Sequence, residues 1–82
     1  MIKGRIQLLK PGYQVVIYRG KKYGVTRTDF NKGKSIKVYA EELGGSDFIS
    51  LNFYMLNSGD RLKPCEMLEE KVLDFLTKYE RE

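Results

Sequence analysis

The amino-acid sequence predicts an α+β domain: a four-stranded antiparallel β-meander with one C-terminal α-helix packed across one face. Apolar and polar residues alternate along residues 34–56, which is typical of strands with one buried and one exposed face. Four β-rich stretches follow one another through short glycine-containing connections, and such sequential neighbours usually pair. A long helical spacing of apolar residues occurs near the C-terminus. At 82 residues, the chain has the length of a single domain.

The first thirty residues divide into a short N-terminal segment and two strands. The apolar spacing in residues 1–12 fits either a helix or a strand, and we expect a short helix or turn that caps the sheet. Residues 13–19 (YQVVIYR) and 23–30 (YGVTRTDF) are rich in β-branched and aromatic side chains, which favours strands. Gly20 and Lys21 fit a two-residue hairpin turn with glycine in its first central position.

Residues 34–56 form the most strongly patterned hairpin of the chain. Residues 36–41 and 49–55 alternate in polarity, and residues 43–47 (LGGSD) supply the glycines that a turn requires. Residues 31–34 (NKGK) form the preceding hairpin connection. The four strands therefore follow one another as a meander.

From Glu66 onward, the spacing of apolar residues predicts the C-terminal helix. Its apolar stripe consists of Leu68, Val72, Phe75, Leu76 and Tyr79. We expect the stripe to cover the sheet face that carries Ile36, Val38, Ile49, Leu51 and Phe53. The opposite face then presents Lys37, Tyr39, Ser50, Asn52 and Tyr54.

Composition excludes several classes of protein. Apolar runs are too short for a membrane span or a signal peptide, and one cysteine cannot form an internal disulfide, so we expect a cytoplasmic protein. The absence of histidine removes the commonest general base and the commonest transition-metal ligand. Glu41 and Glu42 are adjacent and point to opposite faces of a strand, so we predict no metal site and no cofactor.

Charge is distributed unevenly along the chain. Residues 1–40 carry a net charge of +9 and residues 41–82 carry −5, which gives +4 for the whole chain. This asymmetry indicates a basic surface that attracts polyanions. Two complementary faces that meet in a homodimer, or a merely solvated surface, would explain it equally well.

Three segments carry a resemblance to a known family. They are Tyr23–Thr26 (YGVT), Ala40–Gly45 (AEELGG) and Lys63–Met67 (KPCEM). Together they resemble a family of small bacterial proteins of uncharacterised function, whose members are often labelled peptide methionine sulfoxide reductase. The resemblance extends over about residues 12–79 and implies a thiol-dependent reduction of methionine sulfoxide.

Cys65 is the candidate nucleophile for such a reaction. It lies at or just before the start of the predicted helix, where free backbone N–H groups favour a thiolate. A sulfenic acid formed on Cys65 and resolved by an external thiol would complete the reduction. The alternative is a half-buried cysteine that packs the connection between strand and helix, because a free cysteine usually behaves as a small apolar residue.

Basic and aromatic residues are interleaved on and around the face that the helix leaves open. Unpaired bases stack on aromatic side chains of such sheets, while Lys and Arg hold the phosphates. The order of four strands and a helix also resembles, in topology alone, the repeating unit of the whirly and Pur-alpha single-strand binders. The predicted nucleic-acid-binding residues are Lys21, Lys22, Arg27, Lys32, Lys34, Lys37, Tyr39 and Tyr54.

The sequence thus predicts a small cytoplasmic binding module whose partner is single-stranded nucleic acid. Two alternatives remain open at this point: the reductase that uses Cys65, and a protein–protein adaptor that dimerises through its sheet.

Overall fold

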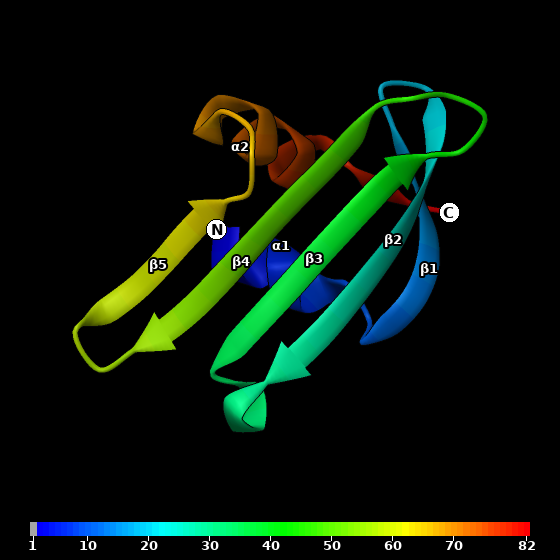
Figure 1. Ribbon diagram of the computed structural model, residues 1–82. Helices are drawn as coiled ribbons and strands as arrows, with labels where there is room; N and C mark the ends of the chain where they lie inside the picture. Colours follow the sequence, from blue (N-terminus) through cyan, green and yellow to red (C-terminus); the bar gives the residue numbers. More distant parts are fainter. Residues whose placement is uncertain (1) are drawn as a thin grey trace.

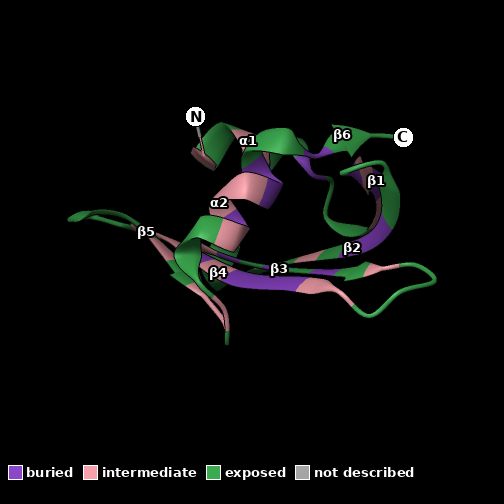
Figure 2. Cartoon of the chain, turned by 90° about the horizontal axis from the view of Figure 1, so that it is seen from above, coloured by how far each residue is buried: buried purple, intermediate pink, exposed green. Residues whose placement is uncertain are grey.

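The computed structural model describes residues 2–82 and shows one antiparallel sheet with two helices on the same side. Six strands lie in the order β5-β4-β3-β2-β1-β6. Figure 1 looks onto the uncovered side of the sheet, with α1 and α2 behind it. Figure 2 shows both helices above one face and the β1 end of the sheet curling toward them. The α+β class, the antiparallel sheet and both helices are therefore confirmed, whereas the sheet has six strands in place of the four predicted.

The elements have the following bounds. They are α1 (Ile2–Leu8), β1 (Gly12–Tyr18), β2 (Lys21–Phe30), a 3₁₀ turn η1 (Asn31–Gly33), β3 (Ser35–Glu42), β4 (Phe48–Leu56), β5 (Gly59–Pro64), α2 (Glu69–Lys78) and β6 (Glu80–Arg81). None of the helices in residues 2–82 is long and apolar enough to cross a membrane.

The alternation predicted for β3 and β4 is confirmed. Val38 and Leu51 are Cα partners in the ladder, and both side chains are fully buried. On the same face, the two strands also bury Ile36, Ala40, Ile49 and Phe53. Val72, Phe75 and Leu76 of α2 complete this core from the helix side. Because side chains alternate with period two, the other face of both strands is left without a covering layer.

The sequence prediction missed β5 and β6. No strand was predicted between residue 56 and the C-terminal helix, but the turn is limited to Asn57 and Ser58, and β5 then pairs with β4 from Gly59 to Pro64. Leu62 is the one aliphatic residue of β5 apart from its terminal proline, so the strand has almost no apolar periodicity to recognise. Charged residues and a proline are typical of an edge strand, because they discourage further pairing.

The C-terminal helix begins three residues later than predicted. Glu66 has a φ of 60°, which is incompatible with a right-handed helix, so the chain turns before α2 begins at Glu69. Leu68 was expected in the apolar stripe, but it lies in extended conformation before the helix and is 74% exposed. Tyr79, just beyond the helix, is buried as expected.

The turn between β1 and β2 is also displaced by one residue. Tyr18 and Lys21 are partners at the end of the ladder, so the two central residues are Arg19 and Gly20 and not Gly20 and Lys21. Both have positive φ, 53° and 75°. Two positive φ angles define a type I′ turn, whose twist matches that of the flanking strands.

The N-terminal segment is a helix, and α1 closes the end of α2. Ile6 and Leu9 are fully buried in the core. The Arg5 guanidinium donates to the backbone oxygens of Leu76 (2.7 Å) and Tyr79, and it lies 4.1 Å from the centroid of the Tyr79 ring. The Leu76 carbonyl belongs to the last turn of α2, whose carbonyl groups have no partners within the helix, and Tyr79 is the residue that follows the helix. A cation at this end also complements the helix dipole.

Candidate nucleic-acid interface

The uncovered side of the sheet, here called the open face, carries a mixture of basic, aromatic and amide side chains. Its residues on β3, β4 and β5 are Ser35, Lys37, Tyr39, Glu41, Phe48, Ser50, Asn52, Tyr54, Leu56, Arg61 and Lys63. This set contains the five residues predicted for the face opposite the helix. It also contains Arg61 and Lys63, which the sequence prediction missed because β5 was taken for a loop.

Three residues form a row across the centre of the open face, here called the basic row. Asn52 of β4 is the Cα partner of Lys37 on β3 and of Lys63 on β5. Neighbouring strands lie about 4.8 Å apart, so the two lysines flank the amide at the distance of one strand on each side. Both lysines are exposed, and neither makes an ion pair with any residue in 2–82.

Aromatic residues lie on both sides of the basic row. Tyr39 is two residues beyond Lys37 on β3, and Tyr54 is two residues beyond Asn52 on β4, so each is about 7 Å from the row along its strand. Tyr39 is 40% exposed, and its ring centroid lies 6.1 Å from that of Phe48. The hydroxyl groups of Tyr39 and Tyr54 form no hydrogen bond within the described residues. Arg61 is the Cα partner of Tyr54 and is also exposed and unpaired there.

A further exposed aromatic residue extends the open face onto β1. Tyr13 is the partner of Thr26, which is the partner of Tyr39, so the two tyrosines share one line across the sheet. Tyr13 is 64% exposed, and its hydroxyl lies over Gly24 so closely that a Cβ at Gly24 would collide with it. The glycine therefore provides the space in which the Tyr13 ring lies on the sheet.

Arg27, one of the predicted nucleic-acid-binding residues, lies on the opposite face of the sheet. It is the partner of Val38, whose side chain is in the core. Its guanidinium binds Asp29 (2.8 Å) and donates to the backbone oxygen of Leu9 (2.5 Å). It thereby joins β2 to the segment that follows α1. The buried Val25, two residues before, is a sequence signal that could have placed Arg27 on the covered face.

Lys21 and Lys22 are engaged by acidic residues of the C-terminal half. Their Nζ atoms lie 3.4 Å from Glu42 and 3.0 Å from Glu82, respectively. Arg19 makes a third such pair with Asp74 at 2.7 Å. Much of the charge asymmetry is thus compensated by ion pairs within the molecule. The cations at the β1–β2 turn are therefore less available to a polyanion than the unpaired lysines of the open face.

Lys32 and Lys34 lie at the other end of the sheet, in and next to η1. Both are exposed and make no ion pair inside residues 2–82. The backbone of Lys34 joins the ladder, because its oxygen accepts from the N–H of Met55 at 2.8 Å. Figure 1 shows η1 at the lower end of the sheet, next to the start of β3.

Cys65 follows β5 and belongs to the open face rather than to the helix. Its N–H donates to the oxygen of Ser50 (2.9 Å), and its Sγ accepts a hydrogen bond from Asn52 Nδ2 (3.2 Å). The side chain is half-buried. Since α2 begins only at Glu69, the expected position at the helix N-terminus is wrong, and its free N–H groups are several residues away.

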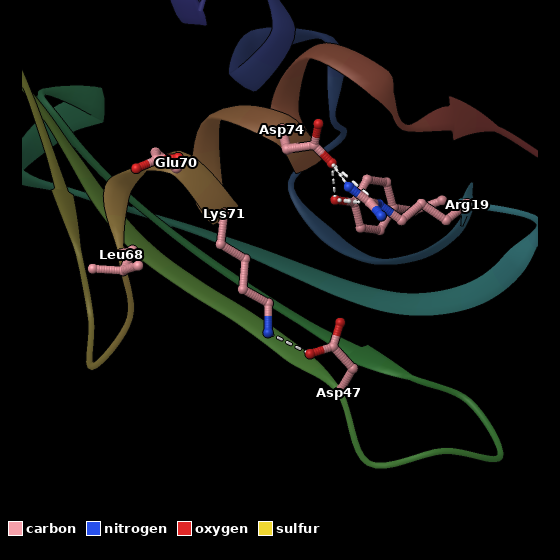
Figure 3. A pocket seen from close by; sticks show the side chains of 7 residues that line it. Arg19, Asp47, Leu68, Glu70, Lys71 and Asp74 are labelled. Carbon is pink, nitrogen blue, oxygen red and sulfur yellow. Dashed lines mark hydrogen bonds and ion pairs between the residues drawn. The ribbon is translucent and has the colours of Figure 1, made fainter.

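A hollow of about 500 Å³ lies on the helix side between α2 and the β1–β2 and β3–β4 turns. Figure 3 shows that its charged side chains reach one another across it: Lys71 binds Asp47, and Arg19 binds Asp74. Tyr23 donates to Asp47 at 2.8 Å and Tyr18 donates to Asp74. Both cations of this groove are therefore engaged by carboxylates.

The same contacts shift the ionisation of these groups. The hydrogen bond from Lys71, aided by that from Tyr23, lowers the pKa of Asp47 despite partial burial. Hydrogen bonds from Lys78, Tyr18 and Arg19 lower the pKa of Asp74. Burial and the neighbouring carboxylate raise the pKa of Tyr23. The groove is thus a set of satisfied pairs that ties α2 to the hairpin turns.

Among residues 2–82, no group of three or more acidic or cysteine side chains is placed to hold a metal ion. Comparisons of the chain with protein-family models, with characterised proteins and with solved structures found no match.

Proposed function

We propose that this protein is a small binding module that takes up single-stranded nucleic acid on its open face. The observation that carries the proposal is the basic row with a tyrosine on each side of it, of which Tyr39 is exposed and Tyr54 is half-buried. Lys37 and Lys63 have no ion pair within residues 2–82, and Tyr39 and Tyr54 flank them.

The chemistry of an unpaired strand fits this arrangement. Every base has a π face that stacks on an aromatic ring, and each stacked base contributes about 1–3 kcal/mol. The phosphates between the bases require cations at short range, which Lys37, Arg61 and Lys63 supply. In a duplex the base faces are stacked on one another, so the tyrosines favour single strands.

The distribution of charge supports the same choice. Of the charged residues on the open face of β3, β4 and β5, three are basic and one, Glu41, is acidic. On the helix side, by contrast, the cations of the groove are bound to carboxylates. The face without a covering layer is therefore also the face with free positive charge.

The proposal is tested by fluorescence anisotropy with short labelled oligonucleotides of mixed sequence, single-stranded and duplex, at several salt concentrations. Three phosphates neutralised by Lys37, Arg61 and Lys63 give a slope of log affinity against log salt of about −2, at about 0.7 per phosphate. Tyr39→Ala and Tyr54→Ala should each weaken binding by about 1–3 kcal/mol. Tyr79→Phe, which leaves the open face untouched, is the matched control.

Other results would contradict the proposal. If no oligonucleotide binds at low salt, or if the affinity is unchanged in both Tyr39→Ala and Tyr54→Ala, the open face does not hold nucleic acid. A mass that doubles with protein concentration in sedimentation, and falls to the monomer in the Tyr39→Ala variant, would assign the face to a second copy of the chain instead.

A further inference from the structure

The side chain of Asn52 is hydrogen-bonded to Cys65 at the centre of the open face. Its Nδ2 donates to the Sγ of Cys65 at 3.2 Å. Its Oδ1 accepts no hydrogen bond within the described residues, and no buried side-chain nitrogen or oxygen atom there lacks a partner. Oδ1 is therefore not fully buried, and it lies on the side of the amide that the sulfur does not occupy.

The basic row thus offers a fixed order of hydrogen-bonding groups. Lysine ammonium groups only donate, and Asn52 presents an acceptor between them. The order donor–acceptor–donor complements an edge with the order acceptor–donor–acceptor. Uracil and thymine have this order on their Watson–Crick edge, from O4 through N3–H to O2. Cytosine and adenine carry an acceptor at the central position, and guanine has two adjacent donors.

We infer that the basic row, Lys37, Asn52 and Lys63, reads the 2,4-dioxopyrimidine base of uracil or thymine in a bound single strand. The inference rests on the proposed function and gives it a specificity. Tyr39 and Tyr54 supply the stacking surface next to the row, and Arg61 stays available for the phosphates. Each ammonium has three donors, so a lysine that meets a base carbonyl can still contact a phosphate.

Cys65 acts as a positioning residue for this recognition. A terminal amide that is free to rotate presents its NH₂ as readily as its oxygen, and then favours no single base. The hydrogen bond to Sγ holds Nδ2 toward β5 and leaves Oδ1 outward. This gives Cys65 a role at the open face that requires no redox chemistry.

The test compares affinities for labelled oligothymidylate, oligouridylate, oligocytidylate and oligoadenylate of equal length. The thymine and uracil strands should bind about tenfold more tightly than the other two, which corresponds to one good pair of hydrogen bonds to a base edge. Equal affinity for the first two assigns the specificity to the Watson–Crick edge that they share, and a difference between them adds a contribution from the 5-methyl group or the sugar. A strand of N3-methylthymidine, which lacks the central donor, should lose the preference.

Single-residue variants distinguish the preference for particular bases from the overall affinity for single strands. Asn52→Ala should bring the four strands to within about twofold of one another while binding persists. Cys65→Ala should reduce the preference, and Cys65→Ser, whose hydroxyl can still accept from Nδ2, should restore most of it. Circular dichroism and thermal unfolding of each variant establish that it is folded.

The preference for uracil and thymine and the binding of single strands can fail separately. Equal binding of all four strands by the wild type, or a preference that survives both N3-methylation and Asn52→Ala, overturns the inference and leaves the proposed function standing. Failure of every strand to bind at low salt removes both.

Discussion

At the scale of single residues, Leu51 of β4 and Leu68, which lies just before α2, show that the burial of a side chain determines its contribution to stability. Leu51 is fully buried between β3, β5 and the helix layer. Leu68 is 74% exposed at the start of α2. The apolar surface of Leu51 is removed from water on folding, whereas that of Leu68 largely is not, so their contributions to stability must differ.

Leu51→Ala should therefore lower the free energy of unfolding by about 2–5 kcal/mol, because it removes buried methyl groups and leaves a cavity. Leu68→Ala is the matched control, and its effect should stay within about 0.5 kcal/mol. Urea unfolding followed by circular dichroism measures both. Equal losses in the two variants would mean that Leu68 packs against the core after all.

At the scale of elements, α2 is a short helix held at both ends by the rest of the molecule. It has ten residues and no side-chain N-cap, and isolated helices of this length are unstable in water. Lys71 and Asp74 tie it to the β3–β4 and β1–β2 turns, and Arg5 binds its last carbonyls. Its position over the sheet therefore depends on ionised carboxylates as well as on apolar packing.

This dependence predicts acid sensitivity. The pKa of Asp47 is lowered in the folded state, so its contribution is fully present above the unfolded pKa of about 3.9 and is lost as the pH falls through and below that value. The pKa of Asp74 is lowered as well, with the same sign. The free energy of unfolding should decline between about pH 5 and pH 2.

Asp47→Asn should reduce stability at pH 7 and weaken this decline, as seen in urea unfolding at a series of pH values. Asp60→Asn is the control, since Asp60 is exposed and makes no ion pair in the described part of the chain. A wild-type stability that is constant from pH 5 to pH 2 would show that neither pair stabilises the fold.

At the scale of the whole molecule, the two sides of the sheet differ in what covers them and in what they leave free. The helices cover one side, and the ion pairs that join the basic and acidic halves of the chain lie around them and at the β1–β2 turn. The other side keeps its cations unpaired within residues 2–82. Position in the fold, and not net charge, therefore decides which arginines can meet a polyanion.

Two arginines on opposite edge strands test this point. Arg61→Ala on β5 should weaken binding of all single strands evenly and make the salt slope shallower by about 0.7. Arg81→Ala on β6 removes the same charge at the other edge of the sheet and should leave affinity and slope nearly unchanged. Anisotropy titrations at several salt concentrations compare the two. Equal effects would indicate a response to net charge alone.

Much of this architecture could be predicted from local pattern. The alternation in residues 36–41 and 49–55 predicted which side chains of β3 and β4 are buried, and so predicted Lys37, Tyr39, Asn52 and Tyr54 on the open face. Arg61 and Lys63 could not be placed this way, because β5 has little periodicity and exists by pairing with the edge of β4.

The sequence by itself determined the properties that depend on neighbours within a few residues: the alternation in β3 and β4, the presence of two helices and the α+β class. Only the tertiary structure decided which charges cancel, on which face Arg27 lies, and that Asn52 stands between two lysines with Cys65 beside it. The physical reason is that strand pairing and ion pairing join residues distant in the chain. Local periodicity limits such contacts but does not specify them.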